Sequence, residues 1–150
     1  MSTEDIKCVV LADRHHTLSE GIRVLLQHEF QAVVTVADEA SLLESALRMQ
    51  PSIVIADLAL TRGDCFGWLR RLLARCPESR VIVLSPYDEP SVKRDAFDAG
   101  AAGVVYKFDI STQLVPAVHE VLAGGRYGSP VAVEQAARSE NGKDQTESSE

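Results

Sequence analysis

Residues 52–57 read SIVIAD, a short run of apolar and β-branched residues that ends on the carboxylate of Asp57. An apolar run of this length predicts a strand that is buried on both faces. Burial on both faces is typical of a parallel sheet whose helices pack on either side. The segment therefore predicts an α/β fold in which Asp57 stands at the carboxyl end of a strand.

Apolar runs of the same kind lie on both sides of this segment. The expected strands are 7–12, 32–37, 52–57, 80–84 and 103–106. Each is followed by apolar residues at helical spacing, which predicts helices beginning at 17 and 41 and helices over 66–75, 90–99 and 111–123. Right-handed crossovers on both faces of the sheet then make a doubly wound, five-stranded parallel sheet with five helices.

Helix ends carry their own signals. Thr17 with Glu20, and Ser41 with Glu44, have the spacing of a capping box, in which the two side chains bind free amides at a helix start. Gly100 is expected to take the left-handed conformation that ends the helix before it.

Composition limits the class of protein. With 150 residues, 45% hydrophobic and 25% charged, the chain is expected to be one soluble domain without a membrane span. The N-terminus lacks the features of a secretory signal, so we expect a cytoplasmic protein. Three scattered cysteines without a C-x-x-C motif suggest neither disulfides nor a cysteine zinc site. The net charge of −7 would repel nucleic acid phosphates, so this chain alone is not expected to bind DNA.

The last residues differ in composition from the rest of the chain. Residues 139–150, SENGKDQTESSE, contain no apolar side chain and cannot offset the entropy cost of becoming ordered. We therefore expect one domain over 1–130 and a C-terminal extension over 131–150, which is either a flexible tail or the start of a linker.

Polar residues follow four of the five expected strands. Asp13 and Arg14 follow the first, Asp57 ends the third, Ser85 follows the fourth, and Lys107 follows the fifth. Sites in open parallel sheets form at the carboxyl ends of the strands. The pattern thus predicts that two carboxylates, a hydroxyl and an ammonium meet at one edge. Taken singly, such residues are more often caps or solvated loop residues than parts of a site.

Four segments carry a resemblance to a known family. VVLADRHHTLSEGIRVLL, PSIVIADLALTRGD, VIVLS and AAGVVYK occur in an order and at a spacing that resemble the receiver domain of two-component response regulators. The resemblance spans 7–130, and AGGRYGSP at 123–130 is similar to the end of receivers in LuxR/NarL-type regulators. It implies the strand order 2-1-3-4-5 of flavodoxin-like and CheY-like proteins. It also implies a signalling protein rather than an enzyme, with self-catalysed phosphotransfer and autodephosphorylation as its only reactions.

The resemblance implies a role for each strand-end residue. Asp57 matches the phosphoacceptor, Ser85 and Lys107 match the hydroxyl and lysine that bind the phosphoryl group, and Asp13 matches an acid of the metal pocket. The implied partners are a histidine kinase or another phosphodonor and a second copy in a homodimer, with DNA bound only through an output domain outside this chain.

Arg14 departs from the family pattern, which has a second acid at this position. Asp13 and Asp57 contribute two negative charges, while Arg14 and Lys107 contribute two positive ones, so the pocket is neutral without a metal. An inward guanidinium would repel a divalent cation, and an outward one would leave a metal ligand missing, so Asp13 and Asp57 are expected to bind Mg²⁺ weakly or not at all. Arg14 could point inward, to pair with a carboxylate or bind phosphoryl oxygens, or outward into solvent, and the sequence leaves both orientations open.

Other classes of function compete with the phosphoacceptor. The main alternative is a pseudo-receiver, a protein-interaction or dimerisation module that works without phosphorylation. A cobalamin-binding module would need D-x-H-x-x-G, which Asp13 and His15 begin but Leu18 breaks. A flavin-binding electron carrier would need a phosphate cradle after the first strand, which is lacking. His15 and His16 suggest a metal, but adjacent side chains point in different directions, so a shared ion is not expected.

Overall fold

The computed structural model describes residues 8–61, 63 and 65–128 of the chain. The predicted C-terminal extension at 131–150 lies outside the described residues, as do the first seven residues of the predicted domain.

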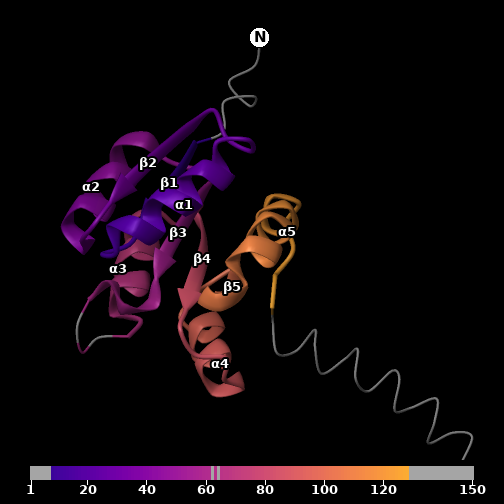
Figure 1. Cartoon of the computed structure of the whole chain (residues 1–150). Helices are drawn as coiled ribbons and strands as arrows, with labels where there is room; N and C mark the ends of the chain where they lie inside the picture. Colours follow the sequence, from indigo (N-terminus) through magenta and orange to yellow (C-terminus); the bar gives the residue numbers. More distant parts are fainter. Residues whose placement is uncertain (1–7, 62, 64, 129–150) are drawn as a thin grey trace, which may run out of the picture.

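Five parallel strands form one sheet in the order β2-β1-β3-β4-β5 (Figure 1). The strands are β1 (Cys8–Ala12), β2 (Ala32–Val36), β3 (Ile53–Asp57), β4 (Arg80–Ser85) and β5 (Gly103–Tyr106). The α-helices among the described residues are α1 (His16–Leu26), α2 (Glu39–Met49), α3 (Gly67–Arg75), α4 (Pro90–Asp98) and α5 (Ile110–Leu122). Short 3-10 turns follow two strands, η2 (Leu58–Leu60) after β3 and η3 (Lys107–Asp109) after β5. The predicted fold and strand order are confirmed.

Helices cover both faces of the sheet because successive strand side chains point to opposite faces. Val9 and Leu11 of β1 belong to one core cluster, which also contains buried residues of α1 and α5. Val10 and Ala12 belong to the other cluster, which contains buried residues of α2, α3 and α4. All five residues of β1 and of β3 are buried, which is the physical reason for their unbroken apolar sequences.

The two predicted capping boxes are wrong. Helix α1 begins at His16 with His15 as its N-cap residue, so Thr17 lies inside the first turn. Helix α2 begins at Glu39, where the carboxylate of Asp38 accepts a hydrogen bond of 2.7 Å from the amide of Ser41. That bond stabilises the ionised form and lowers the pKa of Asp38. Both helices begin one or two residues before the predicted positions, because the connection from the preceding strand is short.

The strand register brings the predicted site residues to one level. Ala12 pairs with Ala56, and Asp57 pairs with Leu84. Ser85 pairs with Tyr106 at the end of β5. Because the strands are parallel and in this register, the residues that end or follow β1, β3, β4 and β5 lie along the same edge of the sheet.

Two further features bear on the sequence predictions. Gly100, directly after α4 and its cap residue, has a φ of +112°, so the predicted left-handed helix end is confirmed. Among the described residues, no helix combines the length and the apolar character needed to cross a bilayer.

Candidate functional site

Two buried carboxylates stand side by side at the carboxyl edge of the sheet. Asp13 follows β1 and is 3% exposed, and Asp57 is the last residue of β3 and is 1% exposed. Strands β1 and β3 are neighbours, and an oxygen of one carboxylate lies within 4.8 Å of an oxygen of the other. The surroundings of these two carboxylates are called the pocket below. Buried charges need a partner, because removing an ion from water costs several kcal/mol or more.

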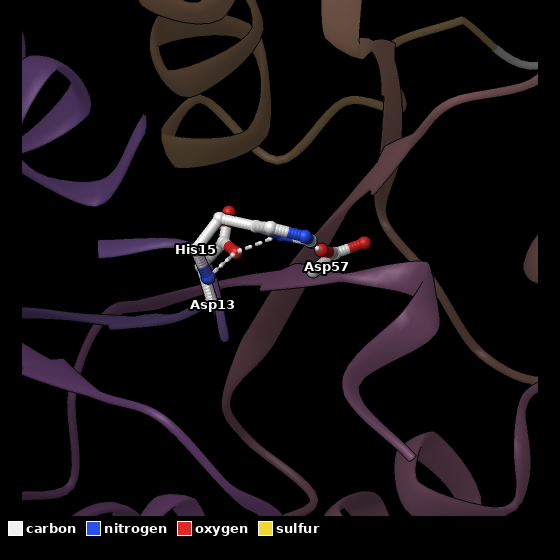
Figure 2. Close-up of side chains that lie close together, drawn as sticks. All are labelled: Asp13, His15 and Asp57. Atoms are coloured by element: carbon white, nitrogen blue, oxygen red, sulfur yellow. Dashed lines mark hydrogen bonds and ion pairs between the residues drawn. The ribbon is translucent and has the colours of Figure 1, made fainter. Parts of the chain in front are cut away.

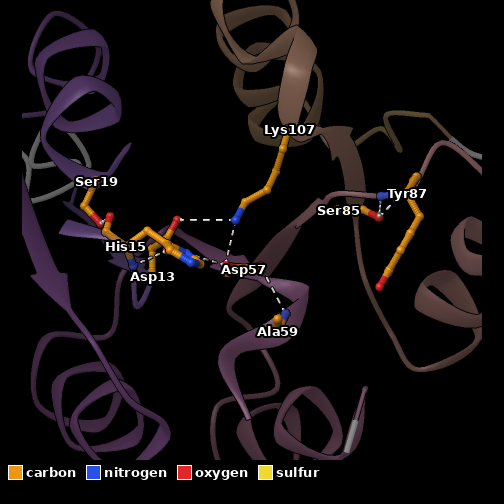
Figure 3. A network of polar contacts seen from close by, with 8 residues as sticks. All are labelled: Asp13, His15, Ser19, Asp57, Ala59, Ser85, Tyr87 and Lys107. Carbon is orange, nitrogen blue, oxygen red and sulfur yellow. Dashed lines mark hydrogen bonds and ion pairs between the residues drawn. The ribbon is translucent and has the colours of Figure 1, made fainter. Parts of the chain in front are cut away.

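Lys107 supplies the positive charge. It is the first residue after β5, and its Nζ lies 2.7 Å from Oδ2 of Asp57 and 4.0 Å from Oδ2 of Asp13 (Figure 3). The lysine side chain is 14% exposed, so water screens this ammonium much less than a surface lysine. One cation therefore compensates two carboxylates of the pocket.

The second oxygen of Asp57 is also held. Its Oδ1 accepts a hydrogen bond of 3.0 Å from the amide of Ala59, in the η2 turn that follows β3. An aspartate that binds the backbone two residues ahead is a common turn device. The amide and the ammonium of Lys107 together fix the orientation of the Asp57 carboxylate.

His15 joins the two carboxylates from the start of α1. Its backbone amide donates a hydrogen bond of 2.7 Å to Oδ1 of Asp13. Its ring Nδ1 lies 3.2 Å from Oδ1 of Asp13 and 3.6 Å from Oδ2 of Asp57 (Figure 2). Sequence reasoning considered His15 only for an ion shared with His16, which it did not expect, and did not predict its contacts with the two acids. The signal that could have found it is its position two residues after Asp13, which lets an N-cap residue fold back over the strand end.

One carboxylate oxygen of the pocket accepts no hydrogen bond from the described residues. Oδ2 of Asp13 is fully buried and has no hydrogen-bond partner among the described residues. The Lys107 ammonium lies 4.0 Å from this oxygen, which is too distant for a hydrogen bond. A buried carboxylate oxygen of this kind is suited to bind a cation.

The side chains of Asp13, His15 and Asp57 could bind a divalent cation, but one of the three donor atoms is not of the kind that Mg²⁺ prefers. Asp13 and Asp57 offer the carboxylate oxygens that a hard ion such as Mg²⁺ takes, with water completing its coordination. The third donor within the same 4.8 Å cluster is the imidazole of His15 rather than another oxygen. Among the described residues, no other acid joins this cluster.

Arg14 forms no ion pair with either carboxylate. It is exposed, and none of the ion pairs between described residues involves it. With Asp13, Thr35 and Val36 it borders a cavity of about 210 Å³. Of the two orientations left open by the sequence, the structure has the outward one.

Ser85 reaches the predicted edge but faces its own loop. Its hydroxyl donates a hydrogen bond of 2.9 Å to the carbonyl of Tyr87 and accepts one of 3.0 Å from the amide of Tyr87 (Figure 3). The structure thus brings Asp13, Asp57 and Lys107 into contact, whereas the Ser85 hydroxyl stands apart and is already paired.

Comparison with known proteins identifies the same family by a family model and by individual relatives. The model of the response regulator receiver domain matches residues 9–119. The chain is 28% identical over 124 residues to the transcriptional regulatory protein DegU of Brevibacillus brevis, a match that covers 81% of this chain and 52% of that protein. It is 31% identical over 131 residues to the response regulator GacA of Pseudomonas aeruginosa, covering 86% of this chain and 61% of that one.

A solved structure agrees with these relatives. The two-component response regulator of the LuxR family from Aurantimonas sp. SI85-9A1 superposes with a TM-score of 0.77 at 26% identity, covering 90% of this chain and 98% of that one. The chain spans little more than half the length of the two curated relatives named above.

Proposed function

The chain belongs to the response regulator receiver domain family, with relatives among LuxR/NarL-type regulators of transcription, and from this premise we propose that it signals by accepting a phosphoryl group on Asp57. The observation that carries the proposal is the 2.7 Å ion pair between Lys107 and Asp57, beside a second buried carboxylate at the edge of the sheet. The predicted family and its class of two-component signalling are confirmed, whereas the chemistry on Asp57 is our proposal.

The proposed reaction is a transfer between two nucleophiles. A carboxylate oxygen of Asp57 attacks the phosphorus of a phosphohistidine on a histidine kinase, or of another phosphodonor. The phosphorus–nitrogen bond breaks, its electron pair stays on the imidazole nitrogen, and that nitrogen takes up a proton from water. The product on this chain is an aspartyl phosphate. Catalysis of such a transfer consists mostly of positioning and charge neutralisation.

Lys107 and Ala59 supply these two effects. The Lys107 ammonium lies 2.7 Å from Oδ2 of Asp57. It would therefore be close to a phosphoryl group bound to Asp57 and could stabilise the negative charge of the phosphoryl oxygens. The Ala59 amide holds Oδ1 of Asp57, which limits rotation of the carboxylate and presents it in one orientation.

Metal binding at this site is also a proposal. A divalent cation held by Asp13 and Asp57 would neutralise phosphoryl oxygens when bound. Because Arg14 replaces an acid of the family pattern, we propose that affinity for Mg²⁺ is weak or absent.

Ser85 provides a route from the phosphoryl group to the surface. Its two hydrogen bonds to Tyr87 hold the loop between β4 and α4, and Tyr87 is 53% exposed. New phosphoryl oxygens would compete for the Ser85 hydroxyl, which would release Tyr87 and change the surface around α4 and β5. The proposed readers of that surface are a second copy of the chain or an output domain. DNA would be bound only through such a domain outside this chain.

The second candidate is a pseudo-receiver that works as an interaction or dimerisation module without phosphorylation. Two observations favour it. Arg14 stands in place of an acid, and the Ser85 hydroxyl already has its partner in Tyr87.

Phosphorylation measured by intact mass separates the two candidates. The protein is incubated with acetyl phosphate or phosphoramidate, with and without Mg²⁺, and weighed by mass spectrometry. We expect the mass of one phosphoryl group to be gained by the wild type and by Asp98→Asn, an exposed control, but not by Asp57→Asn. If the wild type gains no mass under any of these conditions, the pseudo-receiver is the correct function.

A further inference from the structure

Three side chains of different elements direct donor atoms to one point. Asp13 comes from the end of β1, His15 from the start of α1, and Asp57 from the end of β3 (Figure 2). One ligand atom from each, two carboxylate oxygens and an imidazole nitrogen, all lie within 4.8 Å of one another.

The spacing of these atoms suits a small ion with four ligands. Zinc binds imidazole nitrogen and carboxylate oxygen at about 2.0–2.2 Å, so two ligands of a tetrahedral site are separated by roughly 3.4 Å. Nδ1 of His15 lies 3.2 Å from the nearer oxygen of Asp13 and 3.6 Å from that of Asp57. The third separation, between the two carboxylate oxygens, is at most 4.8 Å.

A separate observation concerns the second oxygen of Asp13. The Asp13 side chain is fully buried, and its Oδ2 has no partner among the described residues. In protein interiors nearly every such oxygen is paired, so an orphan next to three clustered donors points to a ligand.

The kind of donor decides the kind of ion. Magnesium takes oxygen ligands in a near-ideal octahedron, and imidazole is not among the ligands that it prefers. Zinc and its first-row neighbours accept imidazole together with carboxylate, and their affinity for such sites rises from Mn²⁺ toward Cu²⁺, with Zn²⁺ also high in the order.

We propose that Asp13, His15 and Asp57 form a binding site for Zn²⁺ or a similar borderline divalent ion, with His15 Nδ1 as the ligand that selects it over Mg²⁺. Three protein ligands leave the fourth position of a tetrahedral ion open to water. Lys107 limits the affinity, because its ammonium competes with the ion for Oδ2 of Asp57. The proposal concerns the protein without a phosphoryl group and does not depend on phosphotransfer.

The chain offers a test that separates this site from other ligands. Cobalt serves as the spectroscopic probe, because tetrahedral Co²⁺ has strong visible absorption bands and can be displaced by Zn²⁺. The wild-type chain without an affinity tag, His15→Ala, and the matched control His28→Ala are titrated with Co²⁺, and Zn²⁺ and Mg²⁺ are then added in competition. His15 and His28 are both exposed, so neither substitution removes a core contact.

Sulfur ligands need their own control. Cys65 is the exposed cysteine among the described residues, and Cys65→Ser removes it. A cobalt complex with sulfur would show a near-ultraviolet charge-transfer band that this variant lacks. We expect Cys65→Ser to keep the visible bands unchanged.

The expected result is specific to His15. We expect His15→Ala to weaken Co²⁺ and Zn²⁺ binding at least about tenfold, and His28→Ala to have no effect. We expect Zn²⁺ to displace Co²⁺ at concentrations at least about a hundredfold lower than Mg²⁺. Equal affinity for Mg²⁺ and Zn²⁺, unchanged binding by His15→Ala, or loss of the bands in Cys65→Ser would each overturn the proposal. The phosphorylation assay has a separate readout, so either proposal can fail alone.

Discussion

The ammonium of Lys107 lies 2.7 Å from Oδ2 of Asp57, although the two residues are 50 positions apart in the chain. The pair bridges β3 and the end of β5 across the intervening strand β4. The same ammonium also attracts a second negative charge, because it lies 4.0 Å from the buried carboxylate of Asp13. One positive charge therefore attracts carboxylates at the ends of β1 and β3 to the end of β5.

Replacing Lys107 by methionine should destabilise the protein. Lys107→Met keeps most of the side-chain volume but leaves two buried carboxylates without their cation, which typically costs about 3 kcal/mol. Urea unfolding at neutral pH measures the loss.

A double variant tests whether the cost comes from the unpaired charge. Asp57→Asn removes one of the two carboxylates, so Lys107→Met combined with Asp57→Asn should be more stable than Lys107→Met alone. Strict additivity of the two single substitutions would show that Lys107 acts through packing rather than through its charge.

Ser85→Ala should loosen the loop between β4 and α4. The hydroxyl accepts from the amide of Tyr87 and donates to its carbonyl, so its removal leaves both groups without this partner and should cost about 1 kcal/mol. Hydrogen exchange at the Tyr87 amide should become faster in Ser85→Ala and remain slow in Ser85→Thr, which keeps the hydroxyl. Unchanged exchange in the alanine variant would mean that other contacts hold the loop.

The fold could be predicted because burial leaves a direct mark on sequence. Strands β1 and β3 are covered on both faces, so nearly every residue in them is apolar, and their boundaries are visible as polar residues. Helix starts were harder to predict. Thr17 and Ser41 have the right spacing for caps, but the structure ends β2 early enough for Asp38 to cap α2. Local capping preferences are weaker than the geometry that links a strand to its helix.

The site could be predicted as a set of strand ends, but not in its side-chain orientations. That Asp13, Asp57 and Lys107 share one edge follows from a parallel sheet in register. The outward position of Arg14 and the pairing of Ser85 with Tyr87 depend on rotamers, which depend on neighbours from other elements. The contacts of His15 were not predicted for the same reason, because they require β1, β3 and α1 to be in place.

Gly128→Ala should release the segment that covers the edge of β5. Gly128 has a φ of +77°, and a Cβ there would lie 2.8 Å from the carbonyl oxygen of Val104. Tyr127 pairs with this edge through Ala102 and Val104, so its amide should exchange faster in the variant.

Gly124→Ala is the matched control for Gly128→Ala. Gly124 has a φ of +95° but meets no atom closer than 3.9 Å. Both variants carry the cost of a positive φ, about 1–2 kcal/mol, and only Gly128→Ala adds a clash with backbone. Equal effects on Tyr127 exchange would contradict the predicted role of the close approach.

The contribution of Asp38 to stability should depend on pH. The bond from the Ser41 amide lowers the pKa of Asp38 in the folded protein, so the stabilisation is fully present above the ordinary aspartate pKa. It is lost as the pH falls through the lowered value. The difference in melting temperature between wild type and Asp38→Ala should therefore be largest at neutral pH and shrink in acid. Glu44→Ala, another exposed acid of α2, controls for the change in net charge, and a difference that grows in acid would contradict the assignment.

Arg14→Asp should strengthen Mg²⁺ binding by restoring an acid to the pocket edge. Changing one positive charge to a negative one near a divalent cation should raise affinity about tenfold even through water, and more at low salt. Trp68 is buried at the start of α3 and donates a hydrogen bond of 3.0 Å to the carbonyl of Cys65, in the loop that follows Asp57, so its fluorescence can report binding. Arg14→Gln removes the repulsion without adding a ligand and should fall between wild type and Arg14→Asp. If wild type and both variants bind Mg²⁺ equally, the exposed guanidinium does not control the metal affinity of the pocket.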